Sequence, residues 1–140
     1  MLDLGVINNS DSIKLKNNFS GLLNEQFNFG LTHGDLSLAN MIVEKTKVSL
    51  IDWGSAEITI VPHFEIMGIF EDSLKESDPL FNNFLSGYGM SWEELSRLKP
   101  EITVLRLLRT IDKLRWAIDR KPEMIQNFSE KVKKLVSEFI

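Results

Sequence analysis

The chain has 140 residues, of which 43% are hydrophobic and 26% charged, with a net charge of −4 and no cysteine. This composition is typical of one globular domain that folds without disulfides. The acidic balance, with no block of lysines or arginines, argues against nucleic-acid binding. No stretch approaches the roughly 20 apolar residues that span a bilayer. We therefore expect no membrane partner. The lack of cysteine fits a reducing cytosol, so we expect a cytoplasmic protein.

A helix is the first predicted element. Residues 1–10 show no clear periodicity and are expected to form a loop. Ser10 or Asp11 can cap a helix that runs to about Phe29, and Gly30 then breaks it. The apolar stripe of this helix consists of Phe19, Leu22, Leu23 and Phe27.

A β-hairpin is the next predicted element. Residues 41–43 and 48–51 are short runs of strand-forming residues. The polar segment 44–47 between them indicates a tight turn. These runs are the only convincing strand signals, so the sequence predicts an α+β fold that is predominantly helical.

From Pro62 onward the sequence predicts helices. Pro62 suits the first turn of a helix, and residues 77–79 suit a second helix start, with proline at its first position. Residues 87–89 end that helix, and residues 91–94 have the pattern of a capping box. Two final amphipathic helices are predicted from apolar residues three and four positions apart. These are Val104, Leu107, Ile111, Leu114 and Ile118 in one, and Ile125, Phe128, Val132, Leu135 and Phe139 in the other.

Polar segments on both sides of the hairpin contain the residues suited to chemistry. Residues 33–40 read H-G-D-x-x-x-x-N, and residues 52–54 read D-W-G. Because a hairpin brings its two ends together, Asn40 and Asp52 should lie near each other, within reach of Asp35. Two carboxylates and an amide are hard oxygen ligands of the kind that Mg²⁺ prefers. The sequence therefore predicts Asn40 and Asp52 as metal ligands and leaves Asp35 for an incoming hydroxyl.

This combination of motifs resembles the catalytic and metal-binding loops of the aminoglycoside phosphotransferase and choline kinase family. That family is itself similar to the protein kinases. Gly34, where protein kinases have arginine, points to the branch that acts on small molecules. H-G-D alone would be a weak signal, but its occurrence with the asparagine, the hairpin and D-W-G is specific. The match by motif covers residues 31–66.

The resemblance implies a role for each matching position and a protein-kinase-like C-terminal lobe as the fold. Asp35 would accept or orient the proton of the acceptor hydroxyl. Asn40 and Asp52 would bind Mg²⁺ on the phosphates of ATP or GTP, and His33 would brace the loop by hydrogen bonds. We therefore assign His33, Asn40 and Asp52 to the cofactor-binding set. The acceptor remains open among aminoglycosides, choline-like amines, sugars and amino alcohols.

The sequence departs from the family where the pattern D-P-x-x-D-L is common. Val61 and Glu65 replace the two aspartates, so we expect Glu65 to be a structural residue at a helix start. His63 is expected to stand alone near that start. Trp53 is expected to pack where related kinases have phenylalanine.

A complete enzyme of this type also has an N-terminal lobe with a phosphate-covering loop and a lysine that contacts the phosphates. No glycine-rich loop and no V-x-K-like strand precede residue 30. We therefore expect residues 1–140 to form a single domain, the C-terminal lobe, with little phosphotransfer on its own. The missing lobe could be supplied in trans, and apolar surface left exposed without it would favour self-association.

Two other functions are compatible with the residues. The chain could be a remnant of the C-terminal lobe that binds Mg²⁺ or an acceptor without transfer. It could also be a metal-dependent hydrolase, if His33, Asp35, Asn40 and Asp52 hold two metals. We rank the hydrolase last, because two-metal sites usually need more histidines than the two in this chain.

Overall fold

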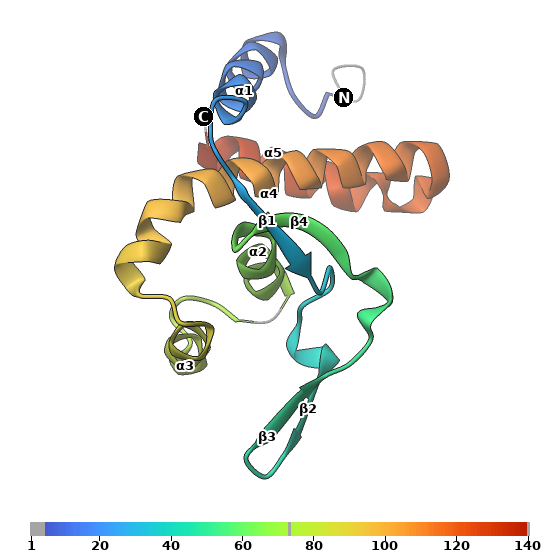
Figure 1. The fold of residues 1–140 in the computed structure, drawn as a ribbon. Coiled ribbons are helices and arrows are strands. Elements are labelled where there is room, and N and C mark those ends of the chain that lie inside the picture. The colour runs from blue at the N-terminus through green and yellow to red at the C-terminus, as the bar shows by residue number, and fades with distance from the viewer. Residues whose placement is uncertain (1–4, 73, 140) are drawn as a thin grey trace. The chain divides into compact units, whose positions relative to one another are not determined.

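A computed structural model describes residues 5–72 and 74–139 of the chain. In this part of the chain the fold is α+β and predominantly helical, as the sequence predicts (Figure 1). The chain divides into two compact units, a terminal unit (Met1–Glu25 and Thr103–Ile140) and a central unit (Gln26–Ile102). The single domain expected from the sequence stays a prediction. None of the described helices is long and apolar enough to cross a membrane.

The terminal unit is helical and has its own apolar core. It contains α1 (Asn9–Leu22), α5 (Ile125–Phe139) and the C-terminal part of α4 (Trp92–Arg120). Most of the apolar residues predicted three and four positions apart in α4 and α5 face this core, as expected for amphipathic helices. The buried cluster consists of Val6, Leu15, Leu107, Leu114, Val132, Leu135 and Val136.

The predicted bounds of the first helix were wrong at both ends. Its cap is Asn8, whose side chain accepts a hydrogen bond from the Asp11 amide at 2.9 Å, while the Asp11 carboxylate accepts from the Asn8 amide at 3.2 Å. This reciprocal pair is a capping box with an acidic residue at its third position. The helix ends at Leu22, and the residues from Asn28 onward form a strand instead.

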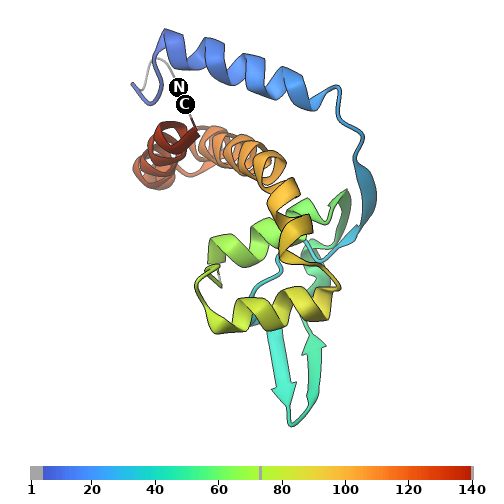
Figure 2. The ribbon, with the colours of Figure 1, turned by 90° about the vertical axis from the view of Figure 1, so that its left-hand side faces the viewer.

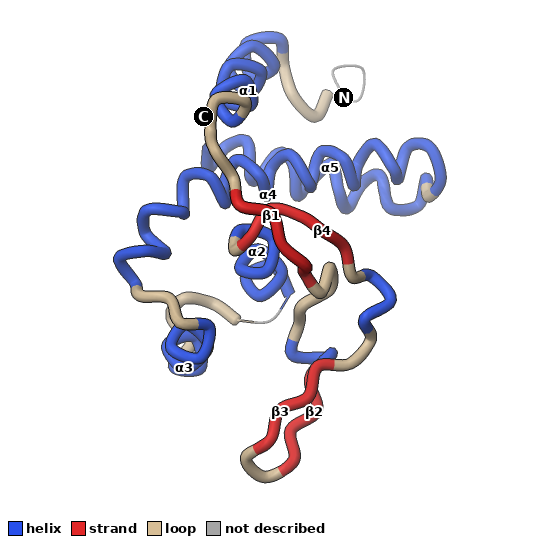
Figure 3. Tube along the Cα trace, viewed as in Figure 1, coloured by secondary structure: helices blue, strands red, loops and turns tan. Residues whose placement is uncertain are grey.

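The central unit contains two small antiparallel sheets (Figure 3). The predicted hairpin is confirmed as β2 (Met41–Glu44) and β3 (Lys47–Leu50), in which Val43 lies opposite Val48. In Figure 1 and Figure 2 this hairpin projects away from the two helices of the same unit described below.

The second sheet was not predicted. It pairs β1 (Asn28–Thr32) with β4 (Glu57–Val61), with Gly30 opposite Thr59. Its two strands are far apart in the sequence, whereas the hairpin's strands are adjacent. Local periodicity therefore gives no sign of the partner that makes residues 28–32 extended rather than helical.

Two short helices complete the central unit. The helix α2 (His63–Asp72) begins one residue after Pro62, whose carbonyl accepts a hydrogen bond from the Ile66 amide at 3.1 Å. Pro62 therefore precedes the first turn and does not open it. The predicted start of α3 (Pro79–Tyr88) is confirmed, because the Asp78 carboxylate caps the Leu80 amide at 2.9 Å. The apolar face of α2 is fully buried at Ile66, Met67 and Ile69.

The helix α4 joins two predicted elements. The capping box at its start is confirmed, since Ser91 and Glu94 exchange backbone and side-chain hydrogen bonds. The helix then runs without a break to Arg120 and includes Pro100. The amphipathic helix predicted around Val104 is therefore a continuation of the capped segment.

Candidate active site

The structure brings Asp35 and Asn40 into direct contact. Both lie in residues 33–40, which we call the His-Gly-Asp loop. The Asn40 side-chain amide donates to the Asp35 carboxylate at 2.9 Å and to the Asp35 backbone carbonyl at 2.8 Å. A short 3-10 turn, Leu38–Asn40, leads from this contact directly into β2. The predicted general base and one predicted metal ligand thus share one end of the hairpin.

The hairpin also brings the backbone at Asp52 to Asn40. Beyond the last ladder pair, Met41 with Leu50, the Ile51 amide donates to the Asn40 carbonyl at 3.0 Å. Asp52 follows directly and has a left-handed backbone conformation, with φ of 59°. Aspartate tolerates this conformation better than most residues do. Within the described residues, the Asp52 carboxylate has no hydrogen-bond or ion-pair partner.

His33 braces the loop, as the sequence predicts. Its ring is buried, and Nε2 lies 2.8 Å from the Ile51 carbonyl, so this nitrogen carries the proton and donates. The ring also packs against Trp53, with the centroids 4.8 Å apart. His33 therefore fixes the loop to the end of β3, while its assignment to the cofactor-binding set stays a prediction.

Gly34 allows the two polar segments to approach each other. Its φ is +77°, a backbone conformation that residues other than glycine rarely adopt. A Cβ atom at this position would overlap the backbone carbonyl of Ser55, just after the D-W-G segment. Contact between the H-G-D and D-W-G segments thus depends on the absence of a side chain at residue 34.

The sequence analysis did not predict two contacts in this region. The Glu65 carboxylate, in the first turn of α2, accepts a hydrogen bond from the His33 backbone amide at 2.6 Å. His63 was expected to stand alone, and this was wrong: its Nε2 lies 2.6 Å from the Glu101 carboxylate. The only sequence signal for the Glu65 contact was its place where the family has an acidic residue, and the partner of His63 had none.

The donor chemistry fits a magnesium ion that takes only part of its coordination from protein. The Asn40 NH₂ group faces Asp35, which leaves the amide oxygen for a metal, and the Asp52 carboxylate has both oxygens available. In residues 5–72 and 74–139, no group of three or more His, Cys, Asp or Glu side chains could hold a metal. Mg²⁺ usually binds through one or two protein oxygens, with water and phosphate completing its shell.

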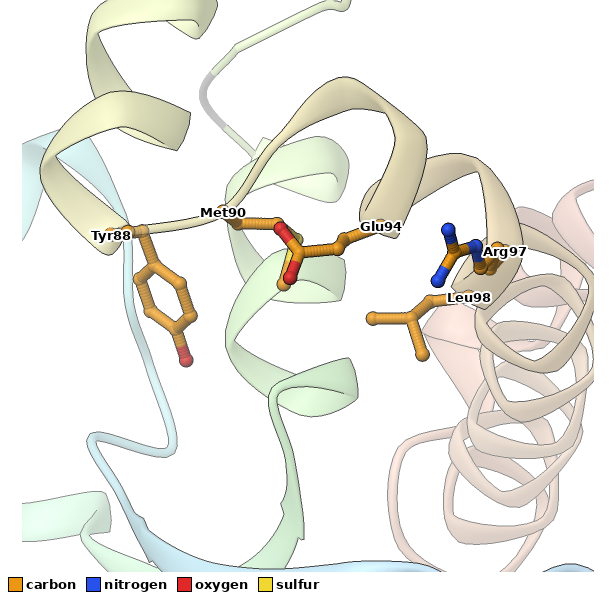
Figure 4. Close-up of a pocket in the computed structure, with 6 residues that line it drawn as sticks. Tyr88, Met90, Glu94, Arg97 and Leu98 are labelled. Atoms are coloured by element: carbon orange, nitrogen blue, oxygen red, sulfur yellow. The ribbon is translucent and has the colours of Figure 1, made fainter.

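A hollow of about 430 Å³ lies elsewhere in the central unit, between the end of α3 and the start of α4 (Figure 4). Burial and the negative charge of Glu65 raise the pKa of the Tyr88 hydroxyl, so this group stays protonated at neutral pH. The backbone amide and side chain of Ser91 lower the pKa of Glu94, which stays ionised. None of the predicted site residues lines the hollow, which is formed by Tyr88, Gly89, Met90, Glu94, Arg97 and Leu98.

A loop that joins an aspartate to an asparagine, linked by a hairpin to a second aspartate, resembles the catalytic and metal-binding loops of phosphotransferases. The family model described as the phosphotransferase enzyme family matches residues 11–101, and the chain belongs to this family. The matched range includes all four predicted site residues as well as Glu65. The chain matches no curated protein and no solved structure.

Proposed function

We propose that the chain provides the catalytic and metal-binding part of a kinase that moves the γ-phosphoryl group of ATP or GTP to a hydroxyl of a small molecule. The observation that carries this proposal is the contact between Asp35 and Asn40 at the end of a hairpin whose other strand leads to Asp52. The central unit would correspond to the core of a protein-kinase-like C-terminal lobe.

Asp35 is the proposed general base. Its side chain is exposed, and only one carboxylate oxygen is engaged by Asn40, so the other can accept a hydrogen bond from the acceptor hydroxyl. As the hydroxyl oxygen bonds to the γ-phosphorus, its O–H bond breaks and the proton passes to Asp35. The bond to the leaving nucleoside diphosphate breaks in the same displacement. The hydrogen bonds from Asn40 to the carboxylate and to the backbone carbonyl hold Asp35 in position throughout.

Asn40 and Asp52 are the proposed magnesium ligands, through the amide oxygen and the carboxylate. When bound, the ion would neutralise charge on the nucleotide phosphates, which is the chemistry that such sites require. His33 positions both residues indirectly, because it holds the carbonyl of Ile51, the residue before Asp52. A basic group and a cover for the phosphates would come from the lobe that the family resemblance implies.

Calorimetry tests the metal site first. Titration of the chain with ATP or GTP, with and without Mg²⁺, should show binding that requires the metal. Asp52→Asn should weaken this binding while preserving the fold, because asparagine also tolerates the left-handed conformation. Glu44→Gln is the matched control, since it removes an exposed carboxylate at the distal end of the same hairpin. Nucleotide binding that is unaffected by Mg²⁺ and by Asp52→Asn would contradict the assignment.

Phosphorus NMR tests the transfer step with a panel of aminoglycoside, amine, sugar and amino-alcohol acceptors. Asp35→Asn should lower the rate of phosphomonoester formation by about 10²–10⁴-fold, the usual contribution of a general base. The comparison is made in whatever assembly shows transfer, with the partner lobe if the chain needs one. An unchanged rate in Asp35→Asn would remove Asp35 from the mechanism. Metal-dependent binding without transfer to any acceptor would favour a binding module instead.

A further inference from the structure

His63 is the first residue of α2, and its buried imidazole makes a specific contact with α4. His63 is 4% exposed and the Glu101 side chain 31% exposed, so the contact is part-buried, with water able to reach it from the Glu101 side only. The His63 Nε2 donates to the Glu101 carboxylate at 2.6 Å, and the Phe27 ring packs against the imidazole in a T-shaped arrangement, with the centroids 5.4 Å apart. All of these residues belong to the central unit. The contact therefore connects the first turn of α2 to α4 through two residues that are 38 positions apart in the sequence.

The same turn of α2 holds the His-Gly-Asp loop. Glu65, two residues after His63, accepts the His33 backbone amide at 2.6 Å. The first turn of α2 thus has one polar contact to α4 and another to the loop that contains Asp35. A shift of this turn by about 1 Å would lengthen the Glu65 hydrogen bond beyond its favourable range.

We propose that the contact between His63 and Glu101 positions the His-Gly-Asp loop, acting through Glu65 and the His33 backbone. The proposal rests on the proposed function only in treating this loop as catalytic. His63 is a positioning residue in this scheme, because it touches neither the nucleotide nor the acceptor.

The physical basis is the difference between apolar burial and a hydrogen bond. Ile66, Met67 and Ile69 bury the face of α2, but burial is non-directional and permits small rotations and slides of the helix. A hydrogen bond weakens steeply with distance and angle, so it selects one rotation and one axial position. Such exact placement is what a general base needs, since small displacements lower catalytic rates strongly.

The other imidazole nitrogen supports a role in orientation. Nδ1 of His63 is buried and has no hydrogen-bond partner among the described residues. A buried polar atom without a partner reduces stability, because it loses its hydrogen bonds to water and gains none in the fold. A phenylalanine of similar shape would fill the site without this cost, so the imidazole is better explained by what Nε2 holds in place.

Amide hydrogen exchange of His33 tests the proposal without any assay of activity. His63→Phe retains an aromatic ring but loses the donor, and it should speed exchange of the His33 amide by tenfold or more. His63→Gln, which can still donate to Glu101, should restore most of the protection. The Ile51 amide, bonded to Asn40, reports the stability of the neighbouring hairpin and should change much less.

Glu76→Gln is the matched control. It removes a different contact to α4, the exposed pair of Glu76 with Lys99 at 2.6 Å, and should leave His33 exchange unchanged. The proposal is wrong if His63→Phe leaves the His33 amide as protected as in the wild type. It is equally wrong if the His33 and Ile51 amides lose protection by the same factor, because that result indicates general destabilisation.

A kinetic measurement separates this proposal from the proposed function. Where transfer is observed, His63→Phe should lower kcat at least threefold with little change in KM for the Mg²⁺–nucleotide, and His63→Gln should recover the rate. A kcat equal to that of the wild type would contradict the positioning role. If no transfer is found at all, the exchange experiment still decides whether His63 positions the loop.

Discussion

The terminal unit contains a cluster of buried apolar side chains, whereas the hairpin of the central unit leaves most of its own exposed. Leu107 and Leu114 are fully buried in the terminal unit, while Val43 in β2 is 68% exposed and Val48 in β3 is 58% exposed. The shape of the site therefore does not depend on apolar burial of this hairpin. It depends on backbone conformation and on hydrogen bonds such as that of Asn40 to Asp35.

This difference predicts which changes each region tolerates. In the terminal unit, substitutions that remove buried side-chain volume should lower the free energy of unfolding strongly. Substitutions at exposed helical positions should lower it little. In the site region, the addition of a single methyl group at a position of unusual backbone conformation should be costly, while exposed side chains can change freely. Matched substitutions in the two regions test this difference.

The largest effect on stability is expected for Gly34→Ala. The left-handed conformation costs about 1–3 kcal/mol in a residue other than glycine, and overlap of the new Cβ with the Ser55 carbonyl adds about 1–3 kcal/mol. Urea denaturation should show a loss of about 4 kcal/mol in the free energy of unfolding. Gly21→Ala in α1 is the control, because the added methyl group meets no atom within 4 Å beyond the adjacent residues and backbone of its own helix, and it should stabilise by up to about 1 kcal/mol. Equal effects at the two glycines would contradict the comparison.

A somewhat smaller loss of unfolding free energy is expected for Leu114→Ala in the core of the terminal unit. The side chain is fully buried, and truncations of this kind cost about 2–5 kcal/mol through lost burial and the cavity left behind. The midpoint of thermal unfolding should fall accordingly. Leu108→Ala, on the same helix but 42% exposed, should cost under about 1 kcal/mol. If the two variants unfold alike, the cluster is not the source of stability in this unit.

The smallest effect is expected at the capping box of α4. Hydrogen bonds from the Ser91 amide and hydroxyl hold the pKa of Glu94 below its usual value. A pKa lowered by folding adds stability that is fully present above the pKa of the unfolded chain and is lost as pH falls through the folded pKa. Ser91→Ala removes the hydroxyl but keeps the amide, so the Glu94 pKa should rise only part of the way.

Carbon NMR of the Glu94 carboxyl group measures this change directly. The titration midpoint should move to higher pH in Ser91→Ala, and the loss of stability in acid should become less steep. Ser20→Ala, at an exposed serine of α1, should leave the Glu94 titration where it is. A Glu94 midpoint that is the same in wild type and Ser91→Ala would show that the hydroxyl contributes nothing.

Some parts of the site could be predicted because they depend on neighbours in the sequence. The hairpin, the cap at Asp78 and the capping box at Ser91 are each formed by residues within a few positions of one another. The approach of Asn40 to the residues after β3 follows from the hairpin alone. Motif spacing therefore sufficed to place Asp35 and Asn40 at its end, although their proposed chemistry still requires the experiments above.

Other parts could not be predicted because their partners lie far away in the chain. Residues 28–32 contain only two apolar side chains around Gly30, too few to identify a strand, and pairing with β4 makes them extended. The contacts of Glu65 with His33, and of His63 with Glu101, join segments separated by more than thirty residues. Nothing in the local pattern around His63 indicates a buried hydrogen bond.

The amino-acid sequence was enough to indicate the family, the helical character, the hairpin and the candidate site residues. Each of these depends on composition or on spacing along the chain, and short spacing fixes local geometry. The folded structure was needed to reveal the second sheet and the polar contacts that hold the His-Gly-Asp loop. Those features depend on pairings between distant segments, which are selected by the folded backbone and cannot be read from the periodicity of either segment.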